Sequence, residues 1–376
     1  MNALLVHSGG PTPVINASMA GVVEEARRHP RIVALYGAAF GLSGALKEDF
    51  FDLFAQSAAT LDAVANEPSS ALGTSRTELD ERAFEELLAV CRRRDIRYLF
   101  LTGGNGSMAT AARIAGAAGD SLQVIGIPKT IDNDLLETDH TPGYATTARF
   151  FACAVRDIGA DNRALAGQVQ FVEVLGRNAG WLVAATCLAR YHEDDAPHLI
   201  YYPETQLPLD RLMADIDRVY SRLGRCVIAI CEGQLDQRGE AFGADERGGS
   251  RAKLAMNLAH RLATLTTQHL KLKARGEKPG LLGRSWWTDE PRQDRAEARL
   301  CGASAVRAAC EGRTGVMVTL LRAPGSVYGV STGLAPLERV ASGERLLPAE
   351  WRDSPAFLEY VVPLVGTIPH YTRLQK

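Results

Sequence analysis

The segment Pro128–Asp134, with the sequence PKTIDND, places a lysine and two carboxylates directly after the apolar run Gln123–Ile127. An apolar core would not tolerate these charges unpaired, so we expect them at a site that handles charge. If residues 131–134 are extended, Asp132 and Asp134 project to the same side, where they could share a metal ion or divide the duties of general base and metal ligand. A solvated turn with an Asx cap is the alternative interpretation.

Two glycine-rich loops offer backbone N–H groups to an anion. Ser8–Pro13 (SGGPTP) lies between a strand and a helix that opens near Asn16, and Thr102–Ser107 (TGGNGS) lies between another strand and helix. Glycine lets the backbone approach a phosphate at a helix N-terminus, although each loop alone is also typical of tight packing. Phosphoryl transfer needs a positioned hydroxyl, a carboxylate that accepts its proton, cations over the transferring group and usually Mg²⁺. The two loops and the segment 128–134 together supply candidates for the groups that the protein must contribute to phosphoryl transfer.

Strand-like runs alternate with helix-like segments along the chain, and these elements must position the loops. The expected strands are 3–7, 98–102, 123–127, 168–174, 199–202, 226–231 and 315–321, and the expected helices are 16–29, 81–94, 107–118, 145–159, 179–191, 209–223 and 251–275. Apolar residues recur every three or four positions in the helices. The alternation predicts an α/β fold of mostly parallel sheets, in which ligands bind outside the carboxyl ends of the strands.

The length and composition favour two α/β lobes. A chain of 376 residues with 46% hydrophobic residues is long enough for two domains, each with its own core. The stretch 271–299 is rich in charge, glycine and proline, and we expect a surface connection that carries the chain between the lobes. The tail 331–376 is irregular but apolar enough to pack.

The charge pattern excludes several classes of partner. The formal net charge is −2, from 42 basic and 44 acidic residues, and the basic residues are spread along the chain. Neither a nucleic-acid surface nor an anionic-membrane surface is indicated, so any anion site must be local. Without an apolar stretch of roughly 20 residues or a signal-peptide pattern, we expect a cytoplasmic protein. The seven cysteines form no C-x-x-C pair and are expected to be buried thiols.

Five motifs together resemble the phosphofructokinase family in order and spacing, from residue 3 to about 330. They are Ser8-Gly9-Gly10, Leu72–Arg76 (LGTSR), Gly103–Ser107, Pro128–Asp134 and Val172–Gly180 (VEVLGRNAG). The resemblance implies two Rossmann-like lobes with the active site in the cleft between them, Mg²⁺ as cofactor, and a homodimer or homotetramer. It also implies a phosphoryl-donor lobe formed by 1–142 with about 286–315, and a sugar-phosphate lobe formed by 143–285 with about 316–376.

The resemblance carries catalytic roles onto matching positions. Asp132 is expected to take the proton from the sugar 1-hydroxyl, Asp134 to be its electrostatic and metal-binding neighbour, and Thr130 to touch the transferring phosphoryl group. Arg76 is expected near the donor phosphates, a task that suits a fixed guanidinium charge. The expected metal ligands are Asp132, Asp134 and Asn105. The expected donor-binding residues are Gly9, Gly10, Gly104, Asn105, Gly106, Ser107 and Lys129.

The resemblance also assigns the residues that bind the sugar phosphate. Leu175, Gly176 and Arg177 are expected near the sugar. Glu232, in the run ICEG after a strand, is expected to hydrogen-bond the sugar hydroxyls, although a lone glutamate at a strand end is more often solvated. Arg284, in the run PGLLGRS, is expected to hold the sugar 6-phosphate.

Lys129 bears on the choice of phosphoryl donor, because pyrophosphate users of the family carry lysine where ATP users have glycine. A lysine side chain would fill the space of the nucleotide's α-phosphate, and its ammonium would neutralise the far end of a pyrophosphate. Asn105-Gly106 points the other way, since pyrophosphate users usually have aspartate in place of Gly106. Asn105 also replaces an aspartate that helps to hold Mg²⁺ in many members, and an amide oxygen is the weaker ligand. We predict pyrophosphate as the donor, with ATP as the alternative.

Two positions leave the acceptor open. Gln168 stands where many members have an arginine, and Leu281 stands where many have a histidine. Fructose 6-phosphate is the leading acceptor, which would give fructose 1,6-bisphosphate, and another phosphorylated or unphosphorylated ketose is the alternative. The same departures also allow an inactive regulatory paralogue.

Two other enzyme classes share part of the pattern. The NAD-kinase and lipid-kinase group presents a Gly-Gly-Asp-Gly loop that 103–106 approximates, but this group does not explain 131–134 or 175–177. A nucleotide-binding dehydrogenase would use the first glycine-rich loop, which lacks the G-x-G-x-x-G spacing.

Overall fold

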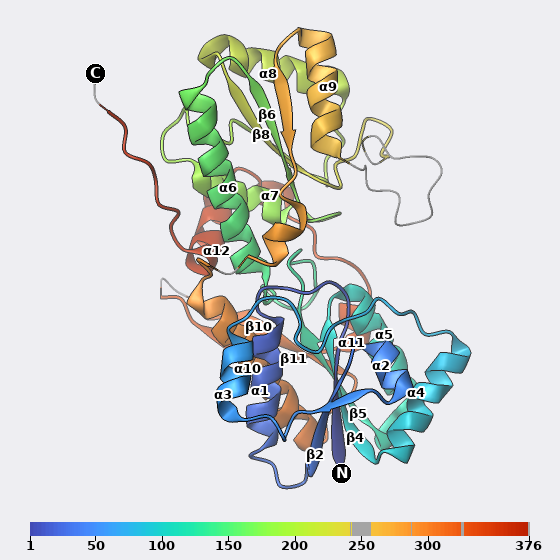
Figure 1. Ribbon diagram of the computed structural model, residues 1–376. Helices are drawn as coiled ribbons and strands as arrows, with labels where there is room; N and C mark the ends of the chain where they lie inside the picture. Colours follow the sequence, from blue (N-terminus) through green and yellow to red (C-terminus); the bar gives the residue numbers. More distant parts are fainter. Residues whose placement is uncertain (241, 243–256, 287, 325–326, 375–376) are drawn as a thin grey trace. The chain divides into compact units, whose positions relative to one another are not determined.

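The computed structural model describes residues 1–240, 242, 257–286, 288–324 and 327–374 (Figure 1). The chain forms two compact units. Unit 1 comprises Met1–Tyr144 and Arg284–Arg345, and unit 2 comprises Ala145–Gly283 and Leu346–Lys376. Both units are therefore discontinuous in sequence. Within the described residues, no helix is long and apolar enough to cross a membrane.

Unit 1 is built on a seven-stranded sheet with the strand order β11-β10-β5-β4-β1-β2-β3. The strands are β1 (Asn2–His7), β2 (Ala34–Ala38), β3 (Phe50–Asp52), β4 (Ile96–Gly103), β5 (Gln123–Pro128), β10 (Val316–Arg322) and β11 (Val330–Pro336). The neighbours from β10 to β2 pair in parallel, whereas the edge strands β3 and β11 pair antiparallel. The predicted mostly parallel sheet is confirmed for this unit.

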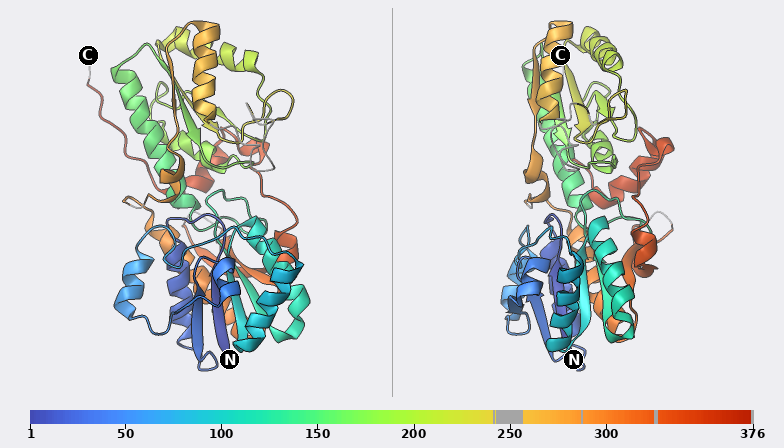
Figure 2. Two further views of the ribbon diagram at one scale, coloured as in Figure 1. Left: turned by 45° about the vertical axis from the view of Figure 1, so that its right-hand side comes forward. Right: turned by 90° about the vertical axis from the view of Figure 1, so that its right-hand side faces the viewer.

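Helices cover both faces of the sheet of unit 1 (Figure 2). The helices are α1 (Ile15–Ala26), α2 (Leu42–Lys47), α3 (Ala58–Ala65), α4 (Glu81–Arg93), α5 (Asn105–Ala118), α10 (Arg292–Cys310) and α11 (Leu337–Val340). Because side chains alternate along a strand, Leu5 and Phe100 face a core with α1 and α10, whereas Leu4 and Leu99 face a core with α4 and α5. Burial on both faces explains why these strands read as continuous apolar runs.

Glycine brings α1 and α10 into direct backbone contact. A Cβ at Gly21 would lie 2.0 Å from the carbonyl oxygen of Arg299, and a Cβ at Gly302 would lie 2.0 Å from that of Ser18. Any larger residue at either position would push the helices apart. The N-terminal and C-terminal parts of unit 1 are therefore locked together at this contact.

Unit 2 is built on a four-stranded parallel sheet with the order β7-β8-β6-β9. The strands are β6 (Val169–Val174), β7 (Leu199–Tyr201), β8 (Cys226–Cys231) and β9 (Ala274–Glu277), and the helices are α6 (Tyr144–Ala164), α7 (Trp181–Ala185), α8 (Leu209–Leu223), α9 (Leu258–Leu270) and α12 (Pro355–Val365). Short 3-10 helices occur in this unit at Thr186–Ala189 and Ala349–Trp351, at the boundary of the two units at Gly280–Arg284, and in unit 1 at Gly119–Ser121. The apolar faces of α8 and α9 pack with Phe171 and Ile228 to form the core.

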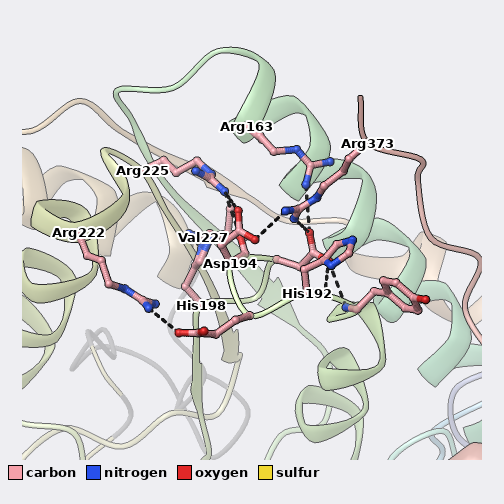
Figure 3. Close-up of polar contacts among 11 residues, drawn as sticks. Arg163, His192, Asp194, His198, Arg222, Arg225, Val227 and Arg373 are labelled. Carbon is pink, nitrogen blue, oxygen red and sulfur yellow. Dashed lines mark hydrogen bonds and ion pairs between the residues drawn. The ribbon is translucent and has the colours of Figure 1, made fainter. Parts of the chain in front are cut away.

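A cluster of charges fastens the C-terminal tail to unit 2 (Figure 3). Arg373 donates to Asp194 Oδ1 at 2.7 Å and also to Asp195. Arg225 reaches Asp194 at 3.1 Å, and Arg163 reaches Asp195 at 3.0 Å. The hydrogen bond from Arg373 is the main reason that the pKa of Asp194 is lowered to about 2. The tail is thus held by several charges rather than by a single pair.

The structure corrects three predictions about organisation. Residues 316–345 belong to unit 1 and not to the second lobe, because β10 pairs with β5 in the sheet of unit 1. The predicted helix 251–275 corresponds to α9 only over 258–270, and its first residues, 251–256, lie outside the described part of the chain. The stretch 271–299 is not only a connection, since it contains β9, which pairs with β6, and the start of α10.

Candidate active site

The carboxyl ends of β1, β4 and β5 bring three of the predicted loops together at one edge of unit 1. In the sheet, His7 pairs with Thr102 and Gly103 pairs with Pro128. Past the strand ends, Ser8 N donates to Thr102 O at 2.9 Å and Lys129 N donates to Gly103 O at 3.0 Å. The loops 8–13, 104–107 and 129–134 therefore leave the sheet side by side, as the strand-end argument predicted.

A fourth predicted motif joins the same edge. Gly9 N donates to Ser75 O at 2.9 Å, and Thr74 Oγ1 donates to Gly9 O at 2.8 Å. These bonds tie the segment LGTSR to the first glycine-rich loop. Arg76, at the end of that segment, is exposed and lies beside Gly10.

Three cations surround the first glycine-rich loop; we call Lys129, Arg76 and Arg284 the cation cluster. A Cβ at Gly10 would lie 2.7 Å from Arg284 Nη1 and 3.6 Å from Arg76 Nη2. A Cβ at Gly9, whose φ is +83°, would lie 3.3 Å from Lys129 Nζ. The two glycines thus let three positive groups approach one short stretch of backbone.

Lys129 is the buried member of the cation cluster, with 3% of its surface exposed. Its Nζ donates to Ser8 O at 2.9 Å and to Gly10 O at 2.6 Å. Burial lowers the pKa of Lys129 to about 8; the charge of Asp132 opposes this shift, and the charges of Arg284 and Arg76 add to it. Burial and the neighbouring guanidinium groups therefore disfavour the ammonium form of Lys129, and a bound anion would favour it.

Residues 129–141, which carry the predicted catalytic groups and are called the catalytic loop below, are shaped by Asn133. This residue has φ +58°, and its Oδ1 accepts a hydrogen bond from Thr141 N at 3.1 Å. Thr141 Oγ1 donates to Thr130 O at 2.8 Å. The segment 131–134 is consequently not extended, so the condition under which Asp132 and Asp134 would project to the same side of a strand is not met.

Asp134 lies against the second glycine-rich loop. Asn105 Nδ2 donates to Asp134 Oδ2 at 2.9 Å. Burial raises the pKa of the Asp134 carboxyl above its usual range, and the charge of Glu344 raises it further. Hydrogen bonds from Thr130 and Asn105 lower this pKa but do not cancel the shift. On the other side of the loop, Asp132 N donates to Thr130 Oγ1 at 3.1 Å. The structure thus brings Thr130, Asp132, Asp134 and Asn105 together.

The second glycine-rich loop forms the start of α5, with Gly104 as the N-cap and Asn105 as the first helical residue. A Cβ at Gly103 would lie 2.0 Å from Ser107 Oγ, so packing requires glycine there and Ser107 is buried. A Cβ at Gly106 would meet nothing within 4 Å. Packing therefore does not require glycine at residue 106, the position at which aspartate was expected for a pyrophosphate user.

The acidic groups suit a hard divalent cation. Asn105 Oδ1 and Asp134 Oδ1 are buried and have no hydrogen-bond partner among the residues that the structure describes. With the Asp132 carboxylate, these oxygens are of the type that Mg²⁺ prefers. Among the same residues, no group of three His, Cys, Asp or Glu side chains is arranged to hold a metal. A Mg²⁺ ion here would therefore draw further ligands from water and substrate phosphates, as Mg²⁺ commonly does.

The predicted sugar residues of unit 2 gather at the carboxyl ends of β6 and β8. Val174 pairs with Cys231, and Glu232 N donates to Val174 O at 2.8 Å. We call residues 175–180 the sugar loop. A Cβ at Gly233 would lie 1.6 Å from the carbonyl oxygen of Arg177, so the sugar loop touches the turn after β8 directly.

Glu232 sits among charges of both signs. Burial raises the pKa of the Glu232 carboxyl, and the nearby Glu173 raises it further, whereas Lys278 and Arg177 lower it. Lys278 Nζ lies 2.6 Å from Glu173 Oε1. A half-buried carboxyl with a raised pKa is suited to hydrogen-bonding a sugar hydroxyl. Leu175, Gly176 and Arg177 lie on the same sugar loop.

Arg284 is assigned to a different unit from the other four predicted sugar residues. Leu175, Gly176, Arg177 and Glu232 lie in unit 2, whereas Arg284 is the first residue of the second part of unit 1. It belongs to the cation cluster beside Gly10. Of the two positions that depart from the family pattern, Gln168 is buried and Leu281 is 62% exposed.

Several residues that support the site were not predicted from the sequence. His7 is buried, and its Nδ1 lies 2.7 Å from Ser70 Oγ, which donates to Gly73 O at 2.7 Å. Burial lowers the pKa of His7 to about 3, and the charge of Lys129 adds to this effect, so the ring is neutral. Its position directly before Ser8 was a signal that it belongs to the site.

Helix α10 supports the end of the catalytic loop and the residues that follow it through two buried carboxylates. Glu297 Oε2 lies 2.7 Å from His140 Nε2, and Asp294 Oδ1 accepts from Gly143 N at 2.8 Å. The spacing of the two carboxylates, one turn apart on α10, places them on one face of the helix. Their partners lie more than 150 residues away in sequence, so no local signal pointed to them.

Comparisons with known proteins identify the family to which the chain belongs. The Phosphofructokinase family model matches residues 2–309. A pyrophosphate–fructose 6-phosphate 1-phosphotransferase of Rhodospirillum rubrum is 38% identical over 381 residues, covering 96% of this chain and 94% of that protein. A sulfofructose kinase of Alkalicoccus urumqiensis is 29% identical over 382 residues, covering 100% of this chain and 98% of that protein.

A solved structure shows the same fold. The pyrophosphate-dependent phosphofructokinase of Marinobacter aquaeolei superposes with a TM-score of 0.87 at 31% identity, covering 97% of this chain and 91% of that one. The chain therefore belongs to the phosphofructokinase family, a family of phosphotransferases. This confirms the resemblance inferred from the five motifs.

Proposed function

We propose that this chain transfers a phosphoryl group from pyrophosphate to the 1-hydroxyl of fructose 6-phosphate, giving fructose 1,6-bisphosphate. The observation that carries the proposal is the cation cluster around Gly9 and Gly10, with Asp132 close enough to act on the charge of the buried Lys129. A compact, highly charged donor matches this arrangement of positive groups.

Lys129 supports pyrophosphate over ATP. Its ammonium is held against the carbonyl oxygens of Ser8 and Gly10, inside the loop where a nucleotide's α-phosphate would need room. The names of the Rhodospirillum and Marinobacter proteins point to the same donor. Gly106 does not outweigh this argument, since its surroundings are open and accept either residue type.

The reaction needs a base for the acceptor hydroxyl, and Asp132 is the group we assign. Asp132 takes the proton of the 1-hydroxyl while that oxygen forms its bond to the transferring phosphorus, and the bond from phosphorus to the bridging oxygen of pyrophosphate breaks. Arg76 and Lys129 neutralise charge on the transferring and leaving phosphates. A Mg²⁺ ion held by Asp132, Asp134 and Asn105 would supply additional positive charge at the phosphates.

The sugar loop and Glu232 bind the acceptor. Leu175 and Gly176 offer backbone groups, Arg177 offers a fixed positive charge, and Glu232 offers hydrogen bonds to hydroxyls. Arg284 can serve the 6-phosphate, as the family resemblance implies, or the donor phosphates, as its place beside Gly10 suggests. In the Arg284→Lys variant, a larger rise in the KM for the acceptor supports the 6-phosphate role, and a larger rise in the KM for the donor supports the donor role.

Product formation from each donor tests the proposal. Fructose 6-phosphate is supplied with pyrophosphate or ATP in the presence of Mg²⁺, with Asp132→Ala and Lys129→Gly beside the parent. We expect turnover with pyrophosphate, little with ATP, and severe loss in Asp132→Ala. Strong use of ATP by the parent would overturn the donor assignment, and retention of most activity by Asp132→Ala would overturn the base.

The acceptor is tested in the same assay. The name of the Alkalicoccus relative makes sulfofructose the most informative competitor, alongside fructose and other ketose phosphates. If no ketose is phosphorylated with either donor, the chain is an inactive regulatory paralogue. We further propose a cytoplasmic homodimer or homotetramer, which light scattering of the purified protein and fractionation of its host cells would test.

A further inference from the structure

The last crossing of the chain from unit 1 to unit 2 lies between Arg345 and Leu346. Each side of this crossing is hydrogen-bonded to one of the two functional loops. We call residues 345–347 the coupling strap. The inference drawn from it rests on the proposed function, because it concerns the influence of the two substrates on each other.

On the side of unit 1, Arg345 fastens the catalytic loop at four backbone oxygens. Its N–H donates to Asp134 O at 2.8 Å, and its Nε donates to Asn133 O at 3.2 Å. Its Nη1 donates to Thr138 O at 2.9 Å and also to Asp139 O. Hydrogen bonds from a guanidinium are stronger than those between neutral groups. The backbone that carries Asp134 is therefore attached firmly to Arg345.

On the side of unit 2, Leu347 is tied to the sugar loop through Glu204. Leu347 N donates to Glu204 Oε1 at 3.0 Å, and the same oxygen accepts from Gly180 N at 2.7 Å. A Cβ at Gly180 would lie 2.7 Å from Glu204 Oε2, so the carboxylate packs directly on the backbone that ends the sugar loop. One carboxylate thus holds both the strap and the sugar loop.

Only Leu346 separates the two anchors, and one residue spans at most ~3.6 Å. A change at the Asn133–Asp134 backbone that moves Arg345 cannot be absorbed by slack in so short a connection. We propose that the coupling strap links the donor site to the sugar loop, so that each substrate changes the affinity for the other. Arg345 and Glu204 are positioning residues in this scheme, because each acts through a loop.

The test lengthens the strap without altering either anchor. Two glycines are inserted between Arg345 and Leu346, and the same insertion after Gly312, in the exposed turn between α10 and β10, is the matched control. The dissociation constant of fructose 6-phosphate is measured by calorimetry with and without saturating magnesium methylenediphosphonate, an inert analogue of pyrophosphate. Linkage requires the same ratio when the two ligands are exchanged.

We expect the analogue to change the affinity of the parent for fructose 6-phosphate by about fivefold or more. The strap insertion should bring this ratio to within about twofold of 1, and the insertion after Gly312 should keep the parent's ratio. Glu204→Ala, which removes the shared acceptor, should bring the ratio of dissociation constants closer to 1. Glu204→Gln, which retains an acceptor oxygen, should restore part of the parent's ratio. If the chain with the inserted strap does not fold, the comparison of Glu204→Ala with Glu204→Gln tests the coupling in its place.

Two outcomes overturn the inference alone: a parent that binds both ligands with a ratio of 1, or a strap insertion and a Glu204→Ala variant that both keep the parent's ratio. A parent that binds neither ligand and has no activity refutes the proposed function as well. Glu193→Ala serves as the control for removal of a carboxylate, because Glu193 is 89% exposed and forms a surface pair with Arg222.

Discussion

Lys129 should make the use of pyrophosphate fall steeply above pH 8. The perturbation is pH itself, acting on an ammonium whose pKa is lowered to about 8 by burial. Below this pH the group is positive and favours an anionic donor. Above it the group is neutral, and the carbonyl oxygens of Ser8 and Gly10 that it contacts remain as partial negative charges toward the donor.

The magnitude follows from the fraction of enzyme in which Lys129 is protonated. With a pKa of about 8, this fraction is about nine tenths at pH 7 and about one tenth at pH 9. Since kcat/KM reports groups of the free enzyme, kcat/KM for pyrophosphate should fall about tenfold over this interval.

The assay measures kcat/KM for pyrophosphate at saturating fructose 6-phosphate between pH 6.5 and 9.5. Lys129→Met keeps a chain of similar length without the charge, and Lys129→Arg keeps a charge that does not titrate in this range. Dividing the values of the parent by those of Lys129→Met cancels the titration of pyrophosphate itself. A parent-to-methionine ratio that stays constant from pH 7 to pH 9 would refute the reasoning about Lys129.

Three further predictions concern other parts of the chain. Asp132→Asn should lower kcat by about 10²–10⁴, measured by initial rates, because it removes a proton acceptor; equal kcat would contradict this. Between about pH 3 and pH 6.5, His7 binds a proton only in the unfolded state, so the free energy of unfolding decreases as the pH is lowered through this range. From pH 7 to pH 5, the free energy of unfolding of His7→Gln, measured with urea, should therefore decrease by about 2 kcal/mol less than that of the parent. Arg373→Ala should lower the thermal midpoint by about 2–4 °C, because it opens a charge network worth about 1 kcal/mol; the exposed pair mutant Arg339→Ala should lower it less, and equal effects would argue against the network.

The sequence predicted the parts of the fold that are marked by local pattern. The runs that became β4 and β5 are buried on both faces, and a continuous apolar run followed by glycine or proline identifies such strands. The pattern does not say which sheet a strand joins. Residues 316–345 were therefore placed in the wrong lobe, since the pairing of Val316 with Ile125 depends on contacts distant in sequence.

The candidate site was predictable where its chemistry is concentrated in short motifs. Lys129, Asp132 and Asp134 lie within one loop, and the family resemblance supplied their expected roles. The extended conformation considered for 131–134 does not occur because of Asn133, a residue type that adopts positive φ more readily than most. Arg345 and Glu204 could not be found, because their partners are joined to them only by folding.

The contact between α1 and α10 also has a consequence for how the chain is made. Ser18 and Gly21 meet residues that a ribosome adds more than 270 positions later, and residues 145–283 are synthesised in between. The N-terminal half of unit 1 must therefore wait with one face of its sheet covered only in part, by α1 and α3, until α10 and β10 emerge. Unit 2 lacks only its C-terminal segment at that time, so it is the part expected to become compact first during translation. A fragment that stops before α10 should accordingly be prone to aggregation.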